Sequence, residues 1–144
     1  MSDKFQYRRT TVCSDITLWE MFGTASDLEW QGLLEVAERW LLEQESRGRK
    51  WGLIIDPSGM DAVSADQRRA AGEWRALNMP LIANTCTCAS YVATNSMLRG
   101  AITAVFWFAK PVVPVSVHAS QEDAHQWVIM KLNDLSVAAR EAMG

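Results

Sequence analysis

Cysteine and histidine are the side chains of this sequence best suited to metal binding or nucleophilic chemistry. Cys86 and Cys88 are separated by one residue, and the chain has one further cysteine, Cys13, and two histidines, His118 and His125. Zinc sites with paired cysteines usually place two to four residues between them and add a second pair of ligands. On a strand, Cys86 and Cys88 would share one face of the sheet. We therefore predict structural thiols that pack against a helix, with no metal and no cofactor.

The known catalytic motifs are missing from the sequence. A nucleophilic triad needs a histidine beside serine or cysteine, with an orienting acid. The chain has no Gly-x-Ser-x-Gly elbow, no Gly-x-x-x-x-Gly-Lys phosphate loop and no Gly-x-Gly-x-x-Gly fingerprint. Asp56 and Lys110 are partly similar to the acid and lysine of a phosphorelay receiver, but Lys110 comes before a strand rather than after it. We therefore predict that the protein is not an enzyme.

Five apolar segments bounded by turn-forming residues are predicted to be strands. They cover residues 7–13, 16–22, 51–56, 80–86 and 111–117. Ser14 and Asp15 connect the first two strands, which indicates a hairpin. The run from Trp51 to Asp56 is followed by Asp-Pro-Ser-Gly, which is typical of a buried central strand that ends in a turn. We expect an Asx hydrogen bond from Asp56 to hold that turn.

Four helices are predicted between and after these strands. They cover residues 26–48, 64–78 and 91–109, and a last helix begins at residue 120. Ser26, Ser64 and Ser120 each begin a capping signal, in which a side chain three residues later completes the helix start. The sequence leaves open whether residues 136–144 continue the last helix or fray.

The alternation of strands and helices predicts the fold class. The order β-β-α-β-α-β-α-β-α indicates a single α/β domain over residues 1–144, with right-handed crossovers. We expect a mixed, mostly parallel five-stranded sheet with about four helices. The opening hairpin supplies the antiparallel edge.

Charge and hydropathy limit the classes of partner. The net charge is −3 and the isoelectric point about 5.4, so we expect no nucleic acid partner, since nucleic acid binding needs clustered positive charge. The longest apolar run, from Ala101 to Ala109, is too short to span a membrane. Three cysteines in a chain without a recognisable export signal fit reduced thiols in the cytoplasm.

Four consecutive large apolar residues, Val105, Phe106, Trp107 and Phe108, cover every side of the helix predicted over residues 91–109. One side must therefore face something other than the sheet of its own domain. The alternatives are burial inside the domain, an oligomer contact such as a homodimer, contact with a partner, or a ligand-lined or lipid-facing surface.

The order and lengths of these elements resemble those of the anti-sigma-factor antagonist (STAS) family, in its bacterial STAS-like branch. The resemblance covers residues 7–135. It is carried by Trp51-Gly-Leu-Ile-Ile-Asp-Pro-Ser-Gly-Met60, by the helix start at Ser64, and by the segment from Val115 to Trp127, in which a last strand precedes an Asp-Ala-x-x-Trp helix. The family implies a cytoplasmic signalling function without catalysis.

The sequence departs from the family at the helix start. Family members carry Asp-Ser there, and a partner kinase phosphorylates the serine. Aligning Asp56 with the strand-end aspartate places Ala65 at the phosphoacceptor position, whereas a slip of one residue would place Ser64 there. Ser64 is also the predicted N-cap. Its role is therefore either capping alone or capping with regulatory phosphorylation, and a helix N-terminus favours a phosphate.

The resemblance implies a regulatory or scaffolding module that binds a protein partner, such as a kinase or another signalling protein. We predict that the contact face surrounds the loop over residues 56–66 and the two helices after it. Its residues are Asp56, Ser58, Met60, Asp61, Ser64, Gln67, Arg68 and Arg69. The alternative function is a small-ligand or lipid-binding domain, with a pocket under the helix segment 98–108.

Overall fold

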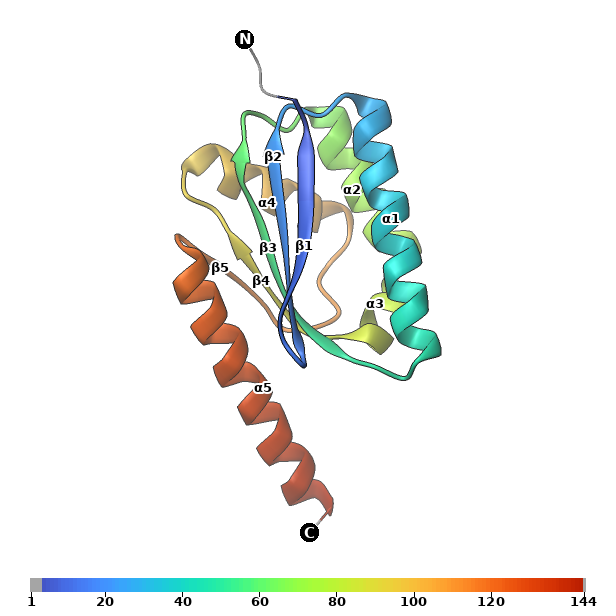
Figure 1. Cartoon of the computed structure of the whole chain (residues 1–144), viewed down its shortest axis with the longest axis vertical. Helices are drawn as coiled ribbons and strands as arrows, with labels where there is room; N and C mark the ends of the chain where they lie inside the picture. Colours follow the sequence, from blue (N-terminus) through green and yellow to red (C-terminus); the bar gives the residue numbers. More distant parts are fainter. Residues whose placement is uncertain (1–3, 144) are drawn as a thin grey trace.

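The fold is built on one five-stranded sheet whose strands follow the order of the sequence. The computed structural model describes residues 4–143. The strands are β1 (Gln6–Cys13), β2 (Ile16–Gly23), β3 (Trp51–Met60), β4 (Cys86–Val92) and β5 (Val115–His118). β1 pairs with β2 in antiparallel fashion, and β2 to β5 run parallel (Figure 1). The predicted mixed, mostly parallel sheet is confirmed.

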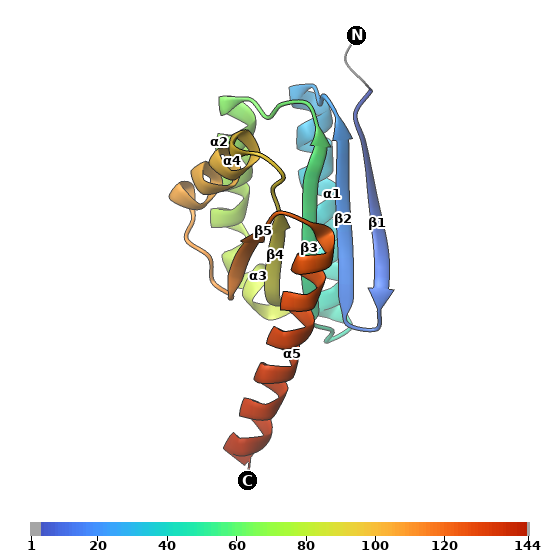
Figure 2. The same ribbon diagram turned by 90° about the vertical axis from the view of Figure 1, so that its left-hand side faces the viewer.

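Helices cover the two faces of the sheet unequally. α1 (Asp27–Ser46), α2 (Ala65–Leu77), α3 (Met79–Thr85) and α4 (Ser96–Phe108) lie on one face, and α5 (Gln121–Met143) lies on the other (Figure 2). On the first face, Trp19 and Met21 pack against Trp30 and Leu33 of α1. On the second, Ile16, Ile54 and Cys88 are among the residues that pack against Val128 of α5. The last turns of α5 project beyond the end of the sheet.

Capping signals in the sequence place three helix starts correctly. Ser26 accepts a hydrogen bond from the backbone nitrogen of Glu29, and Ser64 accepts one from Gln67, with both capping boxes complete. Ser120 Oγ accepts from the backbone nitrogen of Asp123 at 3.2 Å. The hairpin connection at residues 14–15 is also confirmed. Among residues 4–143, no helix is both long enough and apolar enough to cross a membrane.

The segment after α2 differs from the prediction. Residues 80–86 are predicted as a strand, but residues 80–85 form most of α3, so residues 4–143 contain five helices rather than four. Pro80 lies in the first turn of α3, where its missing N–H costs nothing. The strand predicted over residues 80–86 instead begins at Cys86, as β4. α4 therefore begins at Ser96 rather than near Tyr91. β5 is likewise shorter than predicted, and α5 continues through Met143.

β3 also continues further than predicted. The segment Asp56-Pro-Ser-Gly59 does not end the strand but lies within it, with a register shift that pairs Glu20 with Asp56 and Phe22 with Gly59. The predicted Asx hydrogen bond is present, since Ser58 N donates to Asp56 Oδ1 at 2.9 Å. Gly59 is required at this bulge, because a Cβ there would lie 2.4 Å from Phe22 Cδ1.

A second irregularity separates the two buried cysteines. Trp51 pairs with Cys86 and Gly52 pairs with Cys88, so β4 carries one extra residue opposite β3. Cys86 consequently packs with Leu41 and other residues on the face of α1 and α3, whereas Cys88 packs on the face of α5. The prediction that both thiols share one face is wrong, because the bulge interrupts the two-residue alternation of the strand.

Candidate functional site

The loop between β3 and α2 is exposed but firmly held. Asp61 N donates to Gly23 O at 3.0 Å, and Thr24 Oγ1 donates to Asp61 Oδ2 at 2.9 Å. The loop is thereby attached to the end of the neighbouring strand β2. Asp61 itself is exposed, so the loop presents a polar surface in a fixed conformation at the carboxyl ends of two parallel strands.

The first turn of α2 is anchored by the buried side chain of Gln67. Ser64 is exposed, and its Oγ accepts from Gln67 N at 3.1 Å. Gln67 is buried, and its Nε2 donates to Ala25 O at 2.8 Å, just before α1 begins. Trp30 Nε1 donates to Gln67 O at 3.0 Å. These bonds fix the start of α2 against the start of α1.

The predicted contact face divides into accessible and inaccessible residues. Asp61, Ser64 and Arg69 are exposed and Arg68 is half-buried, and we call these four residues the α2-start surface. Met60 and Gln67 are buried, because Met60 belongs to the core cluster around Trp30 and Gln67 reaches toward α1. Neither side chain is available to a partner in this conformation. Fewer residues of the predicted contact face are therefore accessible than the sequence indicated.

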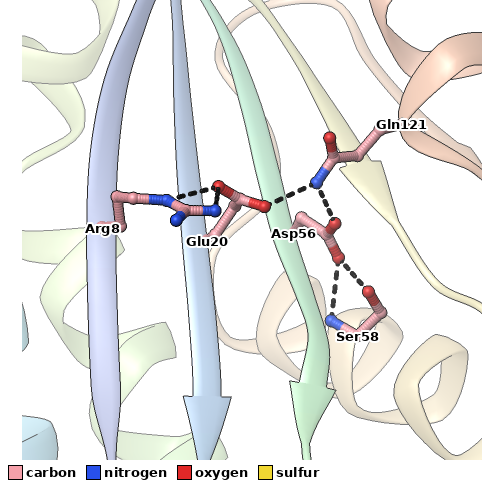
Figure 3. Close-up of polar contacts among 5 residues, drawn as sticks. All are labelled: Arg8, Glu20, Asp56, Ser58 and Gln121. Atoms are coloured by element: carbon pink, nitrogen blue, oxygen red, sulfur yellow. Dashed lines mark hydrogen bonds and ion pairs between the residues drawn. The ribbon is translucent and has the colours of Figure 1, made fainter.

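Asp56 and Ser58 lie on the opposite face of the sheet. Figure 3 shows them in a chain of polar contacts that runs from β1 to β2, passes through Gln121 at the start of α5, and ends on β3. Gln121 Nε2 donates to Asp56 Oδ2 at 2.6 Å and to Glu20 Oε2 at 3.0 Å. Glu20 Oε1 accepts from Arg8 at 2.7 Å, and Ser58 Oγ donates to Asp56 Oδ1. The sequence did not predict this network, because its residues come from four separate elements.

A cavity of about 210 Å³ lies between the sheet and the helices of the first face. Its walls are almost wholly apolar side chains from β2, β3, β4, α1, α2 and α4. α4 contributes Leu98, Ala101, Ile102, Val105 and Phe106. The cavity therefore lies under the helix segment for which the sequence raised a pocket as the alternative.

Few polar groups reach this cavity, and they are concentrated at its α2 wall. Arg75 Nη1 donates to Tyr91 Oη at 3.0 Å, and the guanidinium carbon lies 4.7 Å from the centroid of the Phe106 ring. Burial raises the pKa of Tyr91, and the charge of Arg75 acts in the opposite direction. Arg75 Nε and Trp74 Nε1 are buried and have no hydrogen-bond partner among the described residues.

The aromatic run on α4 is divided between interior and surface. Phe106 meets Tyr91 edge-on, with ring centroids 5.3 Å apart, and Val105 is half-buried. Trp107 is 85% exposed, and Phe108 is 48% exposed although its Cβ packs against Gly72 of α2. Trp107 thus faces away from its own domain. This agrees with the expectation that one of the four residues from Val105 to Phe108 would do so.

The thiols and histidines form no site of the kind considered in the sequence. Burial raises the pKa of Cys86 and raises that of Cys88 to about 11, so both thiols are protonated at neutral pH. His118 Nε2 lies 2.9 Å from Ser116 Oγ, but no hydrogen bond within residues 4–143 joins His118 to an acid. In the same part of the chain, no three His, Cys, Asp or Glu side chains are grouped closely enough to hold a metal ion.

Comparisons with known proteins identify the fold. No protein-family model and no curated protein matches the sequence. Among solved structures, an uncharacterized DUF3478-family protein with a SpoIIAA-like fold from Shewanella loihica PV-4 superposes with a TM-score of 0.57 at 14% identity, covering 89% of this chain and 98% of that chain. An anti-sigma factor antagonist from Mycobacterium paratuberculosis gives a TM-score of 0.57 at 10% identity, covering 87% of this chain and 94% of that one. The chain therefore has a SpoIIAA-like, or STAS-like, fold, as the resemblance predicted.

Proposed function

We propose that this protein is a non-enzymatic regulatory module that binds a protein partner through its α2-start surface. The observation that carries the proposal is the rigid, exposed loop and helix start at the carboxyl ends of β2 and β3, fixed by Asp61 and Gln67. Open parallel sheets bind their ligands at the carboxyl ends of the strands. A surface that is ordered before binding loses little conformational entropy when a partner docks.

The fold supports one class of partner. One structural neighbour is an anti-sigma factor antagonist, a regulator whose name describes action on another protein. By analogy, the partner is a kinase or another signalling protein in the cytoplasm, where free cysteines stay reduced. The exposed Arg69 and Asp61 offer both signs of charge to such a partner.

Ser64 is the candidate phosphosite within this surface. Its exposure leaves Oγ within reach of a kinase, and a phosphate there would sit at the positive end of α2. Phosphorylation would change the charge of the surface without requiring the helix to move. Phosphosite mapping of the protein isolated from its host tests this point, and stoichiometric capture of unmodified Ser64 under every growth condition would contradict it.

Affinity purification from the host cell tests the partner surface. Partner capture by the natural chain is compared with capture by Arg69→Glu, which reverses one exposed charge on α2. Arg140→Glu is the matched control, because Arg140 is exposed in the last turn of α5. We expect loss of the partner from Arg69→Glu alone. Equal capture by all three proteins would exclude the α2-start surface.

We also propose that Trp107 contacts a second copy of the chain. A tryptophan that is 85% exposed on a helix is unusual for an isolated domain, and aromatic residues are enriched where proteins associate. Phe108, which follows Trp107 on α4, is 48% exposed and would extend this contact, whereas Val105 and Phe106 are half-buried.

A second candidate function is the binding of a small apolar molecule. The observation that favours it is the apolar cavity of about 210 Å³ beneath α4. Protein interiors are normally packed with few voids larger than a water molecule. Native mass spectrometry of the protein from its host tests for a molecule that copurifies in this space.

A further inference from the structure

We infer that the cavity binds a medium-chain monocarboxylate, with its alkyl chain between the sheet and the helices and its carboxylate at Arg75 and Trp74. This inference rests on the second candidate function, ligand binding, and specifies the chemistry of the ligand. It combines the size of the cavity, the charges of its walls and two buried donors.

The size of the cavity sets the length of the ligand. An engineered apolar cavity of roughly 150 Å³ in another protein holds one benzene molecule, which has six carbon atoms. On that scale, the 210 Å³ here accommodates about eight carbon-sized atoms. A chain of about eight carbons fits, whereas a membrane lipid with two long acyl chains does not.

The charges of the walls select an anion. Arg68 and Arg75 both line the cavity, and none of the aspartates and glutamates within residues 4–143 does. Arg75 takes part in neither of the ion pairs found within residues 4–143. A half-buried guanidinium loses part of its hydration, and this loss is unfavourable unless an anion approaches the guanidinium. A ligand carboxylate would supply that anion from inside the cavity.

Two unused donors locate the carboxylate. Arg75 Nη1 donates to Tyr91, but Arg75 Nε and Trp74 Nε1 are buried and have no hydrogen-bond partner in the part of the chain that the structure describes. Both residues are neighbours on α2 and line the cavity. Buried donors are almost always hydrogen-bonded in folded proteins, and leaving them unpaired is unfavourable. A carboxylate has two oxygens and can accept from both donors, with charge-assisted strength on the side of Arg75.

Isothermal titration calorimetry on the full chain tests the inference with octanoate, octan-1-ol and butyrate as probes. Octan-1-ol has the same chain length without the charge, and butyrate keeps the charge with a shorter chain. We expect octanoate to bind at least tenfold more tightly than either. Trp74→Phe should weaken octanoate several-fold and leave octan-1-ol unchanged. Arg75→Leu should abolish the preference for octanoate over octan-1-ol, and Arg69→Leu, an exposed arginine on the same helix, should preserve it.

The outcomes separate this inference from the function on which it rests. If octan-1-ol binds as tightly as octanoate, the cavity takes apolar ligands but the carboxylate site is wrong. If none of the three probes binds, both the inference and the ligand-binding function are overturned. Circular dichroism checks each variant. If Arg75→Leu fails to fold, Arg75→Lys replaces it, and this variant should keep the preference for octanoate because it keeps the charge. If Arg75→Lys loses that preference and Trp74→Phe binds octanoate as tightly as the natural chain does, the carboxylate site at Arg75 and Trp74 is overturned.

Discussion

Gln121 Nε2 donates to Asp56 Oδ2 at 2.6 Å, across 65 positions of sequence. The bond joins the first residue of α5 to the centre of the sheet (Figure 3). The same nitrogen donates to Glu20 at 3.0 Å, and Glu20 is the register partner of Asp56 on the adjacent strand. One neutral amide therefore bridges two carboxylates that would otherwise face each other, and Arg8 neutralises one of them.

Replacing this amide by a carboxylate tests its role. Gln121→Glu removes the shared donor and brings a third acid beside Glu20 and Asp56, so we expect the free energy of unfolding at pH 7 to fall by about 1–3 kcal/mol. Urea denaturation measures the change. Gln126→Glu, at an exposed position of the same helix, is the control, and equal losses in the two variants would refute the bridging role.

Two helical glycines are predicted to respond in opposite directions to alanine. A Cβ on Gly72 would lie 2.3 Å from Phe108 Cβ, so Gly72→Ala must push α2 and α4 apart and should destabilise the fold by about 1–3 kcal/mol. Gly100 has nothing within 4 Å of such a Cβ, and Gly100→Ala should stabilise α4 by about 0.5–1 kcal/mol. Thermal denaturation distinguishes the signs, and a stabilised Gly72→Ala would show that the two helices are not in close contact.

The buried thiol of Cys88 predicts a loss of stability at alkaline pH. Burial raises the pKa of Cys88 from 9.0 to about 11 in the folded protein. Below pH 9 the thiol is protonated in both states. Between pH 9 and 11 the unfolded chain loses this proton first, so the free energy of unfolding should fall with pH, at up to about 1.4 kcal/mol per pH unit from this group.

Denaturation curves from pH 8 to 11 measure that slope. Cys88→Ala should have a lower stability at pH 8 but a shallower decline, while Tyr91 and Cys86, whose pKa values are also raised by burial, contribute equally to both proteins. Cys13→Ala, at an exposed position, should keep the slope of the natural chain. A slope unchanged in Cys88→Ala would mean that this thiol is not desolvated.

Trp107 predicts the oligomeric state. If its exposed ring packs against a second copy, the natural chain sediments as a dimer and Trp107→Ser sediments as a monomer, with little change in thermal stability of the folded unit. Leu28→Ser is the control, since Leu28 is 84% exposed on α1. Sedimentation of the natural chain as a monomer at high concentration would rule out the dimer contact.

Local signals predicted much of this fold, because they act within a few residues. The capping boxes at Ser26 and Ser64 fixed two helix starts, and the alternation of strands with helices indicated the mostly parallel sheet. The helix α3 was missed because its apolar residues Leu81 and Ile82 also suit a strand, although Pro80 in its first turn was a signal that favours a helix.

Features that depend on register or on distant contacts could not be predicted in this way. The bulge beside Cys86 moved one cysteine to the other face, and no property of the sequence Cys-Thr-Cys marks it. The buried position of Met60 follows from the extension of β3 past Pro57. The contact between Gln121 and Asp56, and the unpaired nitrogen of Arg75, arise only when separate elements pack together.

Site-specific photocrosslinking is the most direct test of the claim that the α2-start surface binds a protein partner. A photoreactive residue replaces Ala65, which is exposed beside Ser64, or Ala138, which is exposed near the end of α5. Irradiation in the host cell, followed by mass spectrometry, identifies what each position touches. We predict one specific protein partner crosslinked at position 65 and absent at position 138. The same products at both positions, or none at position 65, would contradict the account.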